Sequence, residues 1–587
     1  MSRRADICRG AALAAFVALA WCVIHDRLSL RNWRVPLYAK SDALTVMVGE
    51  KSAVEGYYLP FLPKLNPHFG APFTGDWNDF PSTDEAFALF GGLLAKGIGL
   101  FAASNAVVLI GHLLAALSFY VVCRVLQYRW EWSWAGGVAF GLSHYAFQRG
   151  LHHVTLTYYW LIPPCLLVAW WCGRRSGLEI SSPRFVVALG VALVTGLHNP
   201  YYTYIFLQFL GFAAVAQLMM RNGWRRIAAP LILCAASLGV VLALQVDTIY
   251  YLAAHGKNPE AVQRLYRGLE LYALKPLDMF MPAPGHRLDR ANALVRAYRL
   301  DEARKPLYPG GEPFAQYIGL AGIGALLSLG AASVWRTIGP VPAPPPSEAL
   351  GVAWVILYSV IGGINGLLGQ AGFTLFRCTN RYCIVILALA LLFAVRALSR
   401  LSASWPIGLR TVALLVAVPV ICWDQLPPRD TAASVARIES QLTSDRAFTQ
   451  AMEKALPASA MVFQLPVMSF PESRPIEKMT DYDHFRPYLF SSNLRYSYGA
   501  IKGRGRDVWQ NAASQLPLPE MVATLERYGF AAIYVNRNGY ADGGAGLLSG
   551  LREAGPGEVI ESPAGDLFCV LLHPASRPQL PPVASER

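Results

Sequence analysis

The sequence has few charged residues and no cysteine framework. Charged residues make up 15% of the 587 positions, whereas soluble domains contain about 25%, which excludes a wholly soluble protein. Cys569 is the one cysteine of the C-terminal tail, so the tail contains no internal disulfide. Cys378 and Cys383 lack the second cysteine pair or the nearby histidines of a zinc site. The sequence also has no nucleophile triad, phosphate-binding loop or dinucleotide fingerprint.

A clustered basic patch is missing as well, although the net charge is +13. Nucleic-acid-binding domains gather their lysines and arginines on one face or stripe. Here much of the basic excess lies in short connections between apolar segments, where it orients a membrane protein. We therefore exclude a nucleic-acid partner and expect membrane lipids around the chain.

Long apolar segments dominate the sequence from Ala11 to Cys422. About eleven of them are roughly 16–25 residues long, and about 20 apolar residues cross a hydrocarbon core. We predict spans near residues 10–25, 103–123, 134–148, 154–172, 185–198, 201–219, 228–252, 315–335, 350–370, 382–399 and 408–423. The first has no small-x-small cleavage site before His25, which favours an uncleaved span. Pro163-Pro164 should kink or break the fourth. The sequence thus predicts a mainly α-helical, polytopic membrane protein.

Arginines occur in alternate connections, for example at 124–129, 174–184 and 221–226. The positive-inside rule places these connections and the N-terminus in the cytoplasm. Loops 26–102 and 253–314 and the C-terminal tail then lie on the outer side. This topology requires that Ala86–Ser104, which contains Lys96, lies at the outer interface and does not span the membrane.

The first outer loop, 26–102, is much longer than a connection requires, and such loops are usually functional. Apolar residues at helical spacing from Leu44 predict an interfacial helix over about 43–61, whose wet face contains Glu50. Four carboxylates follow within ten residues: Asp76, Asp79, Asp84 and Glu85. Among turn-forming residues they could form Asx turns or take part in a site. They could also bind a divalent cation, because hard ions favour carboxylate oxygens.

Further polar residues gather in the other outer segments. They are Arg267, Glu270 and Tyr272 in loop 253–314, Arg377 and Arg381 before the tenth span, and His152, His153 and Tyr201 in short turns. Isolated charges are costly in an apolar environment, so these side chains should pair or bind something. The alternatives are an interfacial histidine pair and the aromatic belt of a membrane protein.

The tail has the composition of a small soluble α/β domain. Helices are predicted over 432–456 and 521–528, and buried strands over 460–466, 531–535 and 567–572. The basic and aromatic segment from Arg495 to Trp509 could bind a glycan or an anionic carrier, or be an ordinary loop. We divide the chain into a transmembrane domain, 1–425, and a soluble extracytoplasmic domain, 426–587.

This arrangement resembles the GT-C superfamily of integral-membrane glycosyltransferases, in particular the bacterial YfhO-like proteins. The matching features are Lys40-Ser41-Asp42 after the first membrane exit, two juxtamembrane helices at about 43–61 and 84–100, Leu274–Asp278, Tyr317–Leu320, the arginines Arg377 and Arg381, and the C-terminal outer domain. The chain departs from the paired acidic motif of some branches, because serine occupies position 41.

The resemblance implies a transferase that moves a sugar from a polyprenyl-phosphate carrier to a glycan or lipid acceptor of the cell envelope. The reaction would take place at the outer face of the bacterial inner membrane. Asp42 is then the expected base, unless it only caps a helix, and Asp76 and Asp79 are further candidates. Arg377 and Arg381 would hold the leaving phosphate, with Lys40 and Arg267 in reserve. The expected substrate-binding residues are Glu270, Tyr272, His152, His153, Tyr201 and Trp77. No metal ligands are assigned, and a divalent cation is the one cofactor considered.

Two other classes of function stay open. A transporter or flippase of lipid-linked sugars would have internal repeats and polar residues in mid-span, but the predicted spans are apolar there apart from His112 and Ser143-His144. A non-catalytic scaffold for envelope assembly is the other, and the clustered carboxylates argue against it.

Overall fold

The computed structural model describes residues 3–80, 85–299, 311–312, 315–554 and 557–583. The chain forms two compact units. Unit 1 contains residues 1–30, 106–241 and 264–430, and unit 2 contains residues 31–105, 242–263 and 431–587. This division differs from the expected one at residue 425, because most of the first outer loop and the start of the second are grouped with the tail.

Seven helices in the described part of the chain are long and apolar enough to cross a membrane. They are α1 (Arg3–Ile24), α4 (Leu100–Val125), α9 (Pro200–Met219), α10 (Trp224–Leu244), α14 (Gly319–Ile338), α17 (Cys383–Leu401) and α18 (Ile407–Gln425). Shorter apolar helices are α7 (Ile162–Gly173), α8 (Pro183–Gly196) and α15 (Ser347–Ser359). Every predicted span contains a helix, which confirms the mainly α-helical, polytopic class.

Several predicted spans are interrupted by breaks that hydropathy does not reveal. The segment 134–148 consists of α5 (Trp130–Gly141) and α6 (His144–His152). The segment 228–252 divides into α10 and α11 (Val246–His255), and 350–370 into α15 and α16 (Ile364–Gln370). The predicted span 154–172 is broken at Pro163-Pro164 instead of kinked, because α7 begins at Ile162 and both prolines lie in its first turn, where a missing amide hydrogen costs nothing.

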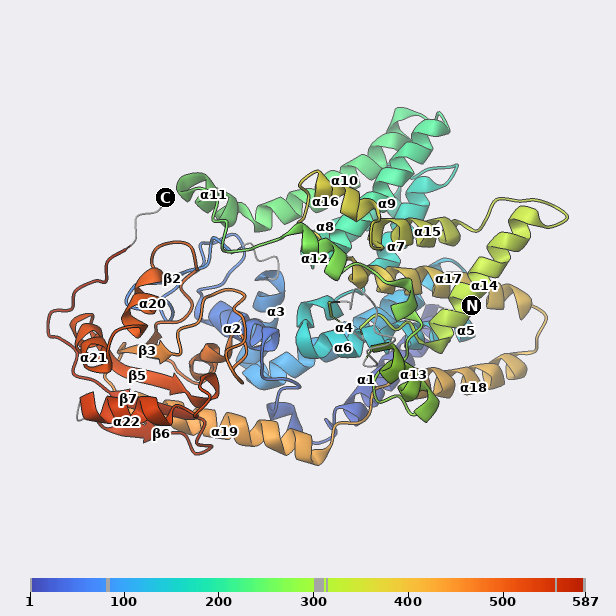
Figure 1. The fold of residues 1–587 in the computed structure, drawn as a ribbon. Helices are drawn as coiled ribbons and strands as arrows, with labels where there is room; N and C mark the ends of the chain where they lie inside the picture. Colours follow the sequence, from blue (N-terminus) through green and yellow to red (C-terminus); the bar gives the residue numbers. More distant parts are fainter. Residues whose placement is uncertain (1–2, 81–84, 300–310, 313–314, 555–556, 584–587) are drawn as a thin grey trace. The chain divides into compact units, whose positions relative to one another are not determined.

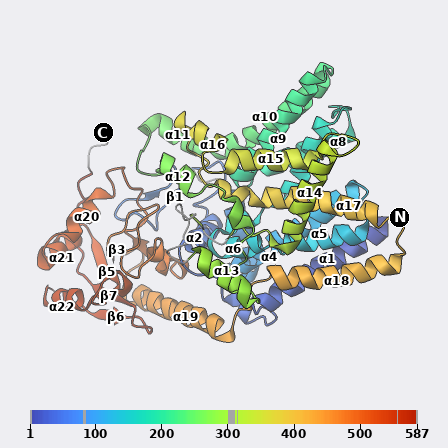
Figure 2. The same ribbon diagram turned by 45° about the vertical axis from the view of Figure 1, so that its right-hand side comes forward.

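Helix α17 is central to unit 1 and packs against α5, α7, α14 and α15 (Figures 1 and 2). Every residue from Cys383 to Phe393 is buried, as expected for a helix that is apolar on all sides. The remaining elements of unit 1 are α12 (Tyr266–Leu271), α13 (Asp289–Arg299) and the short 3-10 helices η2 (Val154–Thr157), η3 (Pro276–Met279) and η4 (Thr379–Tyr382). Because η4 leads directly into α17, the rigid central helix fixes the residues of η4.

Unit 2 is built on a five-stranded mixed sheet with the order β4-β3-β5-β7-β6. The strands are β3 (Met461–Leu465), β4 (Arg495–Tyr496), β5 (Phe530–Asn536), β6 (Val559–Glu561) and β7 (Leu567–Leu571). Strand β3 is parallel to β4 and β5, and β7 is antiparallel to β5 and β6. The three predicted strands are confirmed, whereas the short edge strands β4 and β6 were not predicted.

Two cores cover the two faces of this sheet. Ala532 and Tyr534 of β5 belong to one core, and Ile533 and Val535 to the other, because successive side chains of a strand point to opposite faces. The first core includes residues of α19 (Ala432–Ala455) and of the first loop. The second includes residues of α20 (Val508–Ser514), α21 (Leu518–Arg527) and α22 (Ala545–Ala554) (Figure 1).

The two helices expected in the first loop are present as α2 (Asp42–Glu55) and α3 (Glu85–Ile98), which pack against each other. The prediction that Glu50 lies on a wet face is wrong, since Glu50 is fully buried. Its side chain occupies the space left by Gly91 on α3, where an added Cβ would collide with the Glu50 carboxyl group.

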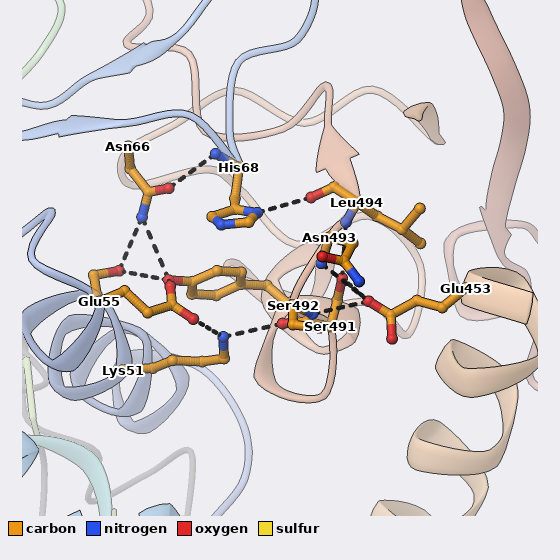
Figure 3. Close-up of polar contacts among 11 residues, drawn as sticks. Lys51, Glu55, Asn66, His68, Glu453, Ser491, Ser492, Asn493 and Leu494 are labelled. Carbon is orange, nitrogen blue, oxygen red and sulfur yellow. Dashed lines mark hydrogen bonds and ion pairs between the residues drawn. The ribbon is translucent and has the colours of Figure 1, made fainter. Parts of the chain in front are cut away.

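A polar network joins the first loop to the tail inside unit 2 (Figure 3). The Tyr488 hydroxyl contacts Glu55 and lies 3.1 Å from the Ser52 hydroxyl, and Lys51 Nζ lies 4.2 Å from the centre of the Tyr488 ring. Strands β1 (Leu65–Asn66) and β2 (Gly75–Asp76) form a short antiparallel pair. His68 follows β1, and its Nδ1 lies 2.9 Å from the carbonyl oxygen of Leu494. These contacts explain why the loop and the tail fold as one unit.

Candidate functional site

A buried arginine and a partly buried arginine of unit 1 share one carboxylate. Arg149 Nη1 lies 2.7 Å from Glu312 Oε2, and Arg381 Nη2 lies 2.6 Å from Glu312 Oε1. The Arg149 side chain is only 2% exposed. His153 completes the group, because its Nε2 lies 3.4 Å from Glu312 Oε1 and its Nδ1 lies 3.4 Å from Arg149 Nη1. We call Arg149, His153, Glu312 and Arg381 the arginine cluster.

The local fold explains why these side chains converge. Arg149 and His153 are four residues apart at the end of α6, so they lie on one helical face. Ser143 caps the start of α6 by accepting a hydrogen bond from the Ala146 amide. Arg381 lies in η4, directly before α17, and its guanidinium stands 4.7 Å from the centre of the Tyr201 ring. Arg149 therefore lies on a helix whose start is capped, and Arg381 lies directly before the buried helix α17.

The cluster carries a net positive charge. Burial alone would raise the pKa of Glu312, but Arg381 and Arg149 lower it well below its usual value. Burial and the Arg149 charge lower the pKa of His153 to about 3, so the imidazole is neutral. Among the residues that the structure describes, two guanidinium charges thus face one carboxylate charge.

Arg149 also has unused hydrogen-bond donors. Its Nε and Nη2 have no hydrogen-bond partner among the described residues. Buried donors that lack a partner are costly, and more so when they are charged. Open donors of a guanidinium suit the oxygens of a phosphate or carboxylate, so this geometry is that of an anion site.

A second aromatic and basic group adjoins the cluster. The Arg377 guanidinium lies 5.1 Å from the centre of the Tyr272 ring, and the Asn380 amide donates to the Tyr272 carbonyl at 3.0 Å. Glu270 on α12 accepts a hydrogen bond from Tyr266, while Arg267 on α12 and His152 are exposed. The structure therefore brings Arg381, His153 and Tyr201 together and places Arg377 and Tyr272 next to them.

The expected base, Asp42, belongs to unit 2. It is the first residue of α2 and is partly exposed, and Lys40 before it is exposed. The Ser41 side chain does not cap the helix and donates to Asp481 at 2.8 Å. Burial raises the pKa of Asp481, which is what a proton acceptor near neutral pH requires. Asp481 is a second candidate base that the sequence did not indicate.

Three other candidates of unit 2 make structural contacts. Asp76 accepts hydrogen bonds from the amide and side chain of Asn78, as an Asx turn does. Asp79 is buried and paired with Arg504 through two contacts of 2.9 Å. Trp77 is 5% exposed, stacks on Phe69 and donates to a backbone carbonyl. These contacts hold Asp79 and Trp77 in the interior of unit 2, and their roles at a site stay predictions.

The acidic run of the first loop does not assemble a metal centre in the described part of the chain. Asp84 lies outside the described residues, and Glu85 is buried and paired with Lys64 at 2.8 Å. Among the residues that the structure describes, no three His, Cys, Asp or Glu side chains are grouped so that they could hold a metal ion.

Sequence reasoning missed Arg149 and Glu312. A signal existed for Arg149, because it lies in a predicted outer turn, where the positive-inside bias disfavours arginine. It also precedes His153 by one helical turn. Glu312 lies in a glycine-rich segment with no periodic pattern, so only the fold brings it to the arginines.

The structure is similar to those of known membrane enzymes, although no family model and no curated protein sequence matches the chain. ArnT from Cupriavidus metallidurans bound to undecaprenyl phosphate has a TM-score of 0.50 and 12% identity, over 97% of this chain and 99% of that one. The chain has the GT-C fold. The apo form of ArnT from Cupriavidus metallidurans has a TM-score of 0.43 and 11% identity, over 96% of this chain and 97% of that one. The oligosaccharyltransferase AglB from Archaeoglobus fulgidus has a TM-score of 0.42 and 11% identity, over 95% of this chain and 74% of that one. The likeness to the lipid-bound ArnT structure supports the predicted fold alone. Membership of the superfamily and the YfhO-like subtype stay predictions.

Proposed function

We propose that the protein is a GT-C glycosyltransferase that moves a sugar from a polyprenyl-phosphate carrier to a glycan or lipid acceptor. The observation that supports this is the arginine cluster. It contains the buried Arg149 with its open donors Nε and Nη2, and its described members carry a net positive charge. An ArnT structure of the same fold holds undecaprenyl phosphate, which is an anion of the kind this cluster suits.

In the proposed reaction the acceptor oxygen attacks the anomeric carbon, and the bond from that carbon to the phosphate oxygen breaks. Negative charge then develops on the leaving phosphate, and Arg149 and Arg381 stabilise it with donors that are already in place. The acceptor proton passes to a carboxylate base. Asp42 is our candidate for this base, with Asp481, which accepts a hydrogen bond from Ser41, as the alternative.

We propose that the protein lies in the bacterial inner membrane with the arginine cluster at the outer face. The arginine-bearing ends of α4, α7, α9 and α17 would then lie in the cytoplasm, as the positive-inside rule predicts. Reporter fusions at residues 290 and 500 should therefore report an outer location. A cytoplasmic signal at either position would contradict this orientation.

The phosphate-binding role is tested by the affinity of the purified protein for undecaprenyl phosphate. A hydrogen bond to a charged group contributes about 1.5–3 kcal/mol, so Arg149→Gln and Arg381→Gln should each weaken binding by about 10- to 100-fold. Arg290 is exposed in the same unit, and Arg290→Gln should bind as the native protein does. Unchanged affinity in both cluster variants would remove the arginine cluster from the proposed site.

The base is tested separately by single-turnover sugar transfer. Asp42→Asn keeps the size of the side chain but cannot accept the proton, so transfer should fall by about 10²- to 10⁴-fold. Binding of undecaprenyl phosphate should be unchanged. The control is Glu477→Gln at an exposed position of unit 2. Full activity of Asp42→Asn would exclude Asp42, and Asp481→Asn in the same assay then decides whether Asp481 is the base.

A further inference from the structure

Unit 1 contains a second feature that the proposed reaction does not use. A cavity of about 620 Å³ lies between α4, α7, α9, α15 and α17. Its walls are mostly apolar and include Leu166, Phe209, Phe212, Leu350, Leu389 and Leu392. The volume falls in the range of about 300–1,000 Å³ that is usual for small-molecule sites.

Charged side chains lie at one end of this cavity. Arg396 Nη2 binds Glu348 Oε2 at 2.9 Å, so this pair is neutral. Arg174 follows the last residue of α7, is exposed, and stands 4.4 Å from the centre of the Trp170 ring. The structure gives Arg174 no carboxylate partner among the described residues. The rim therefore carries one uncompensated positive charge beside a second guanidinium.

The cavity lies at the helix ends opposite to the arginine cluster. Arg381 immediately precedes α17, whereas Arg396 is near the end of that helix. Likewise Tyr201 is at the start of α9, and the cavity is lined by Phe209 and residues after it. Since a helix of about 20 residues spans the bilayer, the cavity and the arginine cluster face opposite leaflets. The cavity is thus separate from the proposed donor site.

We propose that this cavity binds one anionic phospholipid from the leaflet at the arginine-bearing end of the helices. One acyl chain would occupy the apolar walls, and the phosphodiester would bind Arg174 and the free donors of Arg396. The occupant must combine a long apolar chain with a negative head, because the cavity joins an apolar interior to a positively charged rim. Guanidinium groups pair well with phosphate oxygens, and arginines at membrane surfaces attract anionic lipids.

Native mass spectrometry of the detergent-purified full chain tests this binding with phosphatidylglycerol and phosphatidylcholine that carry identical acyl chains. We expect one saturable phosphatidylglycerol, bound more tightly than phosphatidylcholine. Arg174→Gln should weaken phosphatidylglycerol binding by about fivefold, because one surface arginine contributes that much to anionic lipid affinity. It should leave phosphatidylcholine binding unchanged.

The neighbouring Arg175 is exposed and does not line the cavity, so Arg175→Gln is the matched control and should bind as the native chain does. Ala216→Phe places a phenyl ring inside the cavity and should weaken binding of both lipids. If that variant does not fold, Gly173→Leu replaces it, because a Cβ at Gly173 would make only ordinary contacts. Equal binding of the two lipids, equal losses in the Arg174 and Arg175 variants, or undiminished binding after the cavity is filled would overturn the proposal. None of these readouts depends on glycosyltransferase activity.

Discussion

The two units bury arginine–carboxylate pairs in different ways. In unit 2, Arg504 uses all three of its nitrogens: Nε and Nη2 bind Asp79 at 2.9 Å, and Nη1 and Nη2 donate to the carbonyls of His255 and Gly256. In unit 1, Arg149 uses Nη1 on Glu312 and His153 and leaves Nε and Nη2 open. The Arg504 donors are all used within unit 2, whereas two nitrogens of Arg149 are available to the proposed phosphate ligand.

A second arginine of unit 2, Arg486, faces two carboxylates. Arg486 Nε binds Asp445 at 2.9 Å, and its Nη2 binds Asp566 at 2.9 Å. Although burial would raise the pKa of Asp566, Arg486 lowers it. Here two carboxylates surround one arginine, whereas in the arginine cluster two arginines contact one carboxylate.

The largest expected effect comes from breaking the pair of Asp79 and Arg504. Asp79→Ala leaves Arg504 buried without its partner, which should cost about 3–5 kcal/mol of stability. Chemical unfolding in detergent, followed by tryptophan fluorescence, measures this loss. Asp76→Ala removes only a partly exposed turn contact and should cost less, about 1 kcal/mol. A stable but inactive Asp79→Ala protein would instead make Asp79 catalytic and would break the comparison.

A smaller loss is expected from Glu312→Gln in unit 1. The substitution leaves Arg149 and Arg381 without a counter-charge, which should cost about 1–3 kcal/mol. Because a phosphate can replace the lost carboxylate, undecaprenyl phosphate should raise the unfolding temperature of this variant more than that of the native chain. Undecaprenyl phosphate should not rescue Asp79→Ala. Equal stabilisation of native and Glu312→Gln proteins by the lipid would show that the cluster is structural.

Periodic and apolar patterns predicted the helices and the central strands of this fold. The spans, α2, α3, α19, β3, β5 and β7 all follow from local sequence. The helix breaks at Ser143 and Gln245 did not, because an apolar run looks the same whether or not a turn interrupts it. The edge strands β4 and β6 have two and three residues, too few for an alternating pattern, so their pairing with β3 and β7 is set by the tertiary fold.

The candidate site could be predicted only in part. Arg381, His153 and Tyr201 were indicated by their positions at outer helix ends. Glu312 and Asp481 could not be found in this way, because their importance comes from partners far away in the sequence, Arg149 and Ser41. The exposure of Glu50 was predicted wrongly for a related reason. Its charge favoured a solvent-exposed position, but Gly91 on α3 leaves a space for its side chain, which becomes evident only when α2 and α3 pack together.

Glu50 adds a third case to the comparison, a buried carboxyl group with no partner for either oxygen among the described residues. Burial raises its pKa to about 8, so the group is neutral in the folded protein at pH 7. In the unfolded chain it ionises near its usual value of 4.5. Between these values the folded state binds one more proton than the unfolded state, so stability falls as the pH rises. The loss is about 1.4 kcal/mol per pH unit.

The substitution Glu50→Gln should remove this slope. Unfolding free energies at several pH values between 5 and 8 measure the difference between the variant and the native chain. The exposed control Glu477→Gln should keep the native pH dependence. A native slope in Glu50→Gln would show that Glu50 is charged in the fold and has a compensating partner, like Asp79.

The smallest expected effect tests whether helix α6 positions Arg149. Ser143→Ala removes the cap of α6 and should cost about 1 kcal/mol of stability. Ser182 caps α8 in the same way, by accepting from the Phe185 amide, so Ser182→Ala should cost about as much. Because α6 contains Arg149 and is followed directly by His153, whereas α8 carries no residue of the arginine cluster, only Ser143→Ala should also weaken binding of undecaprenyl phosphate. Equal binding by the two variants would mean that the ion pair with Glu312, and not the cap of α6, orients the Arg149 guanidinium and its open donors.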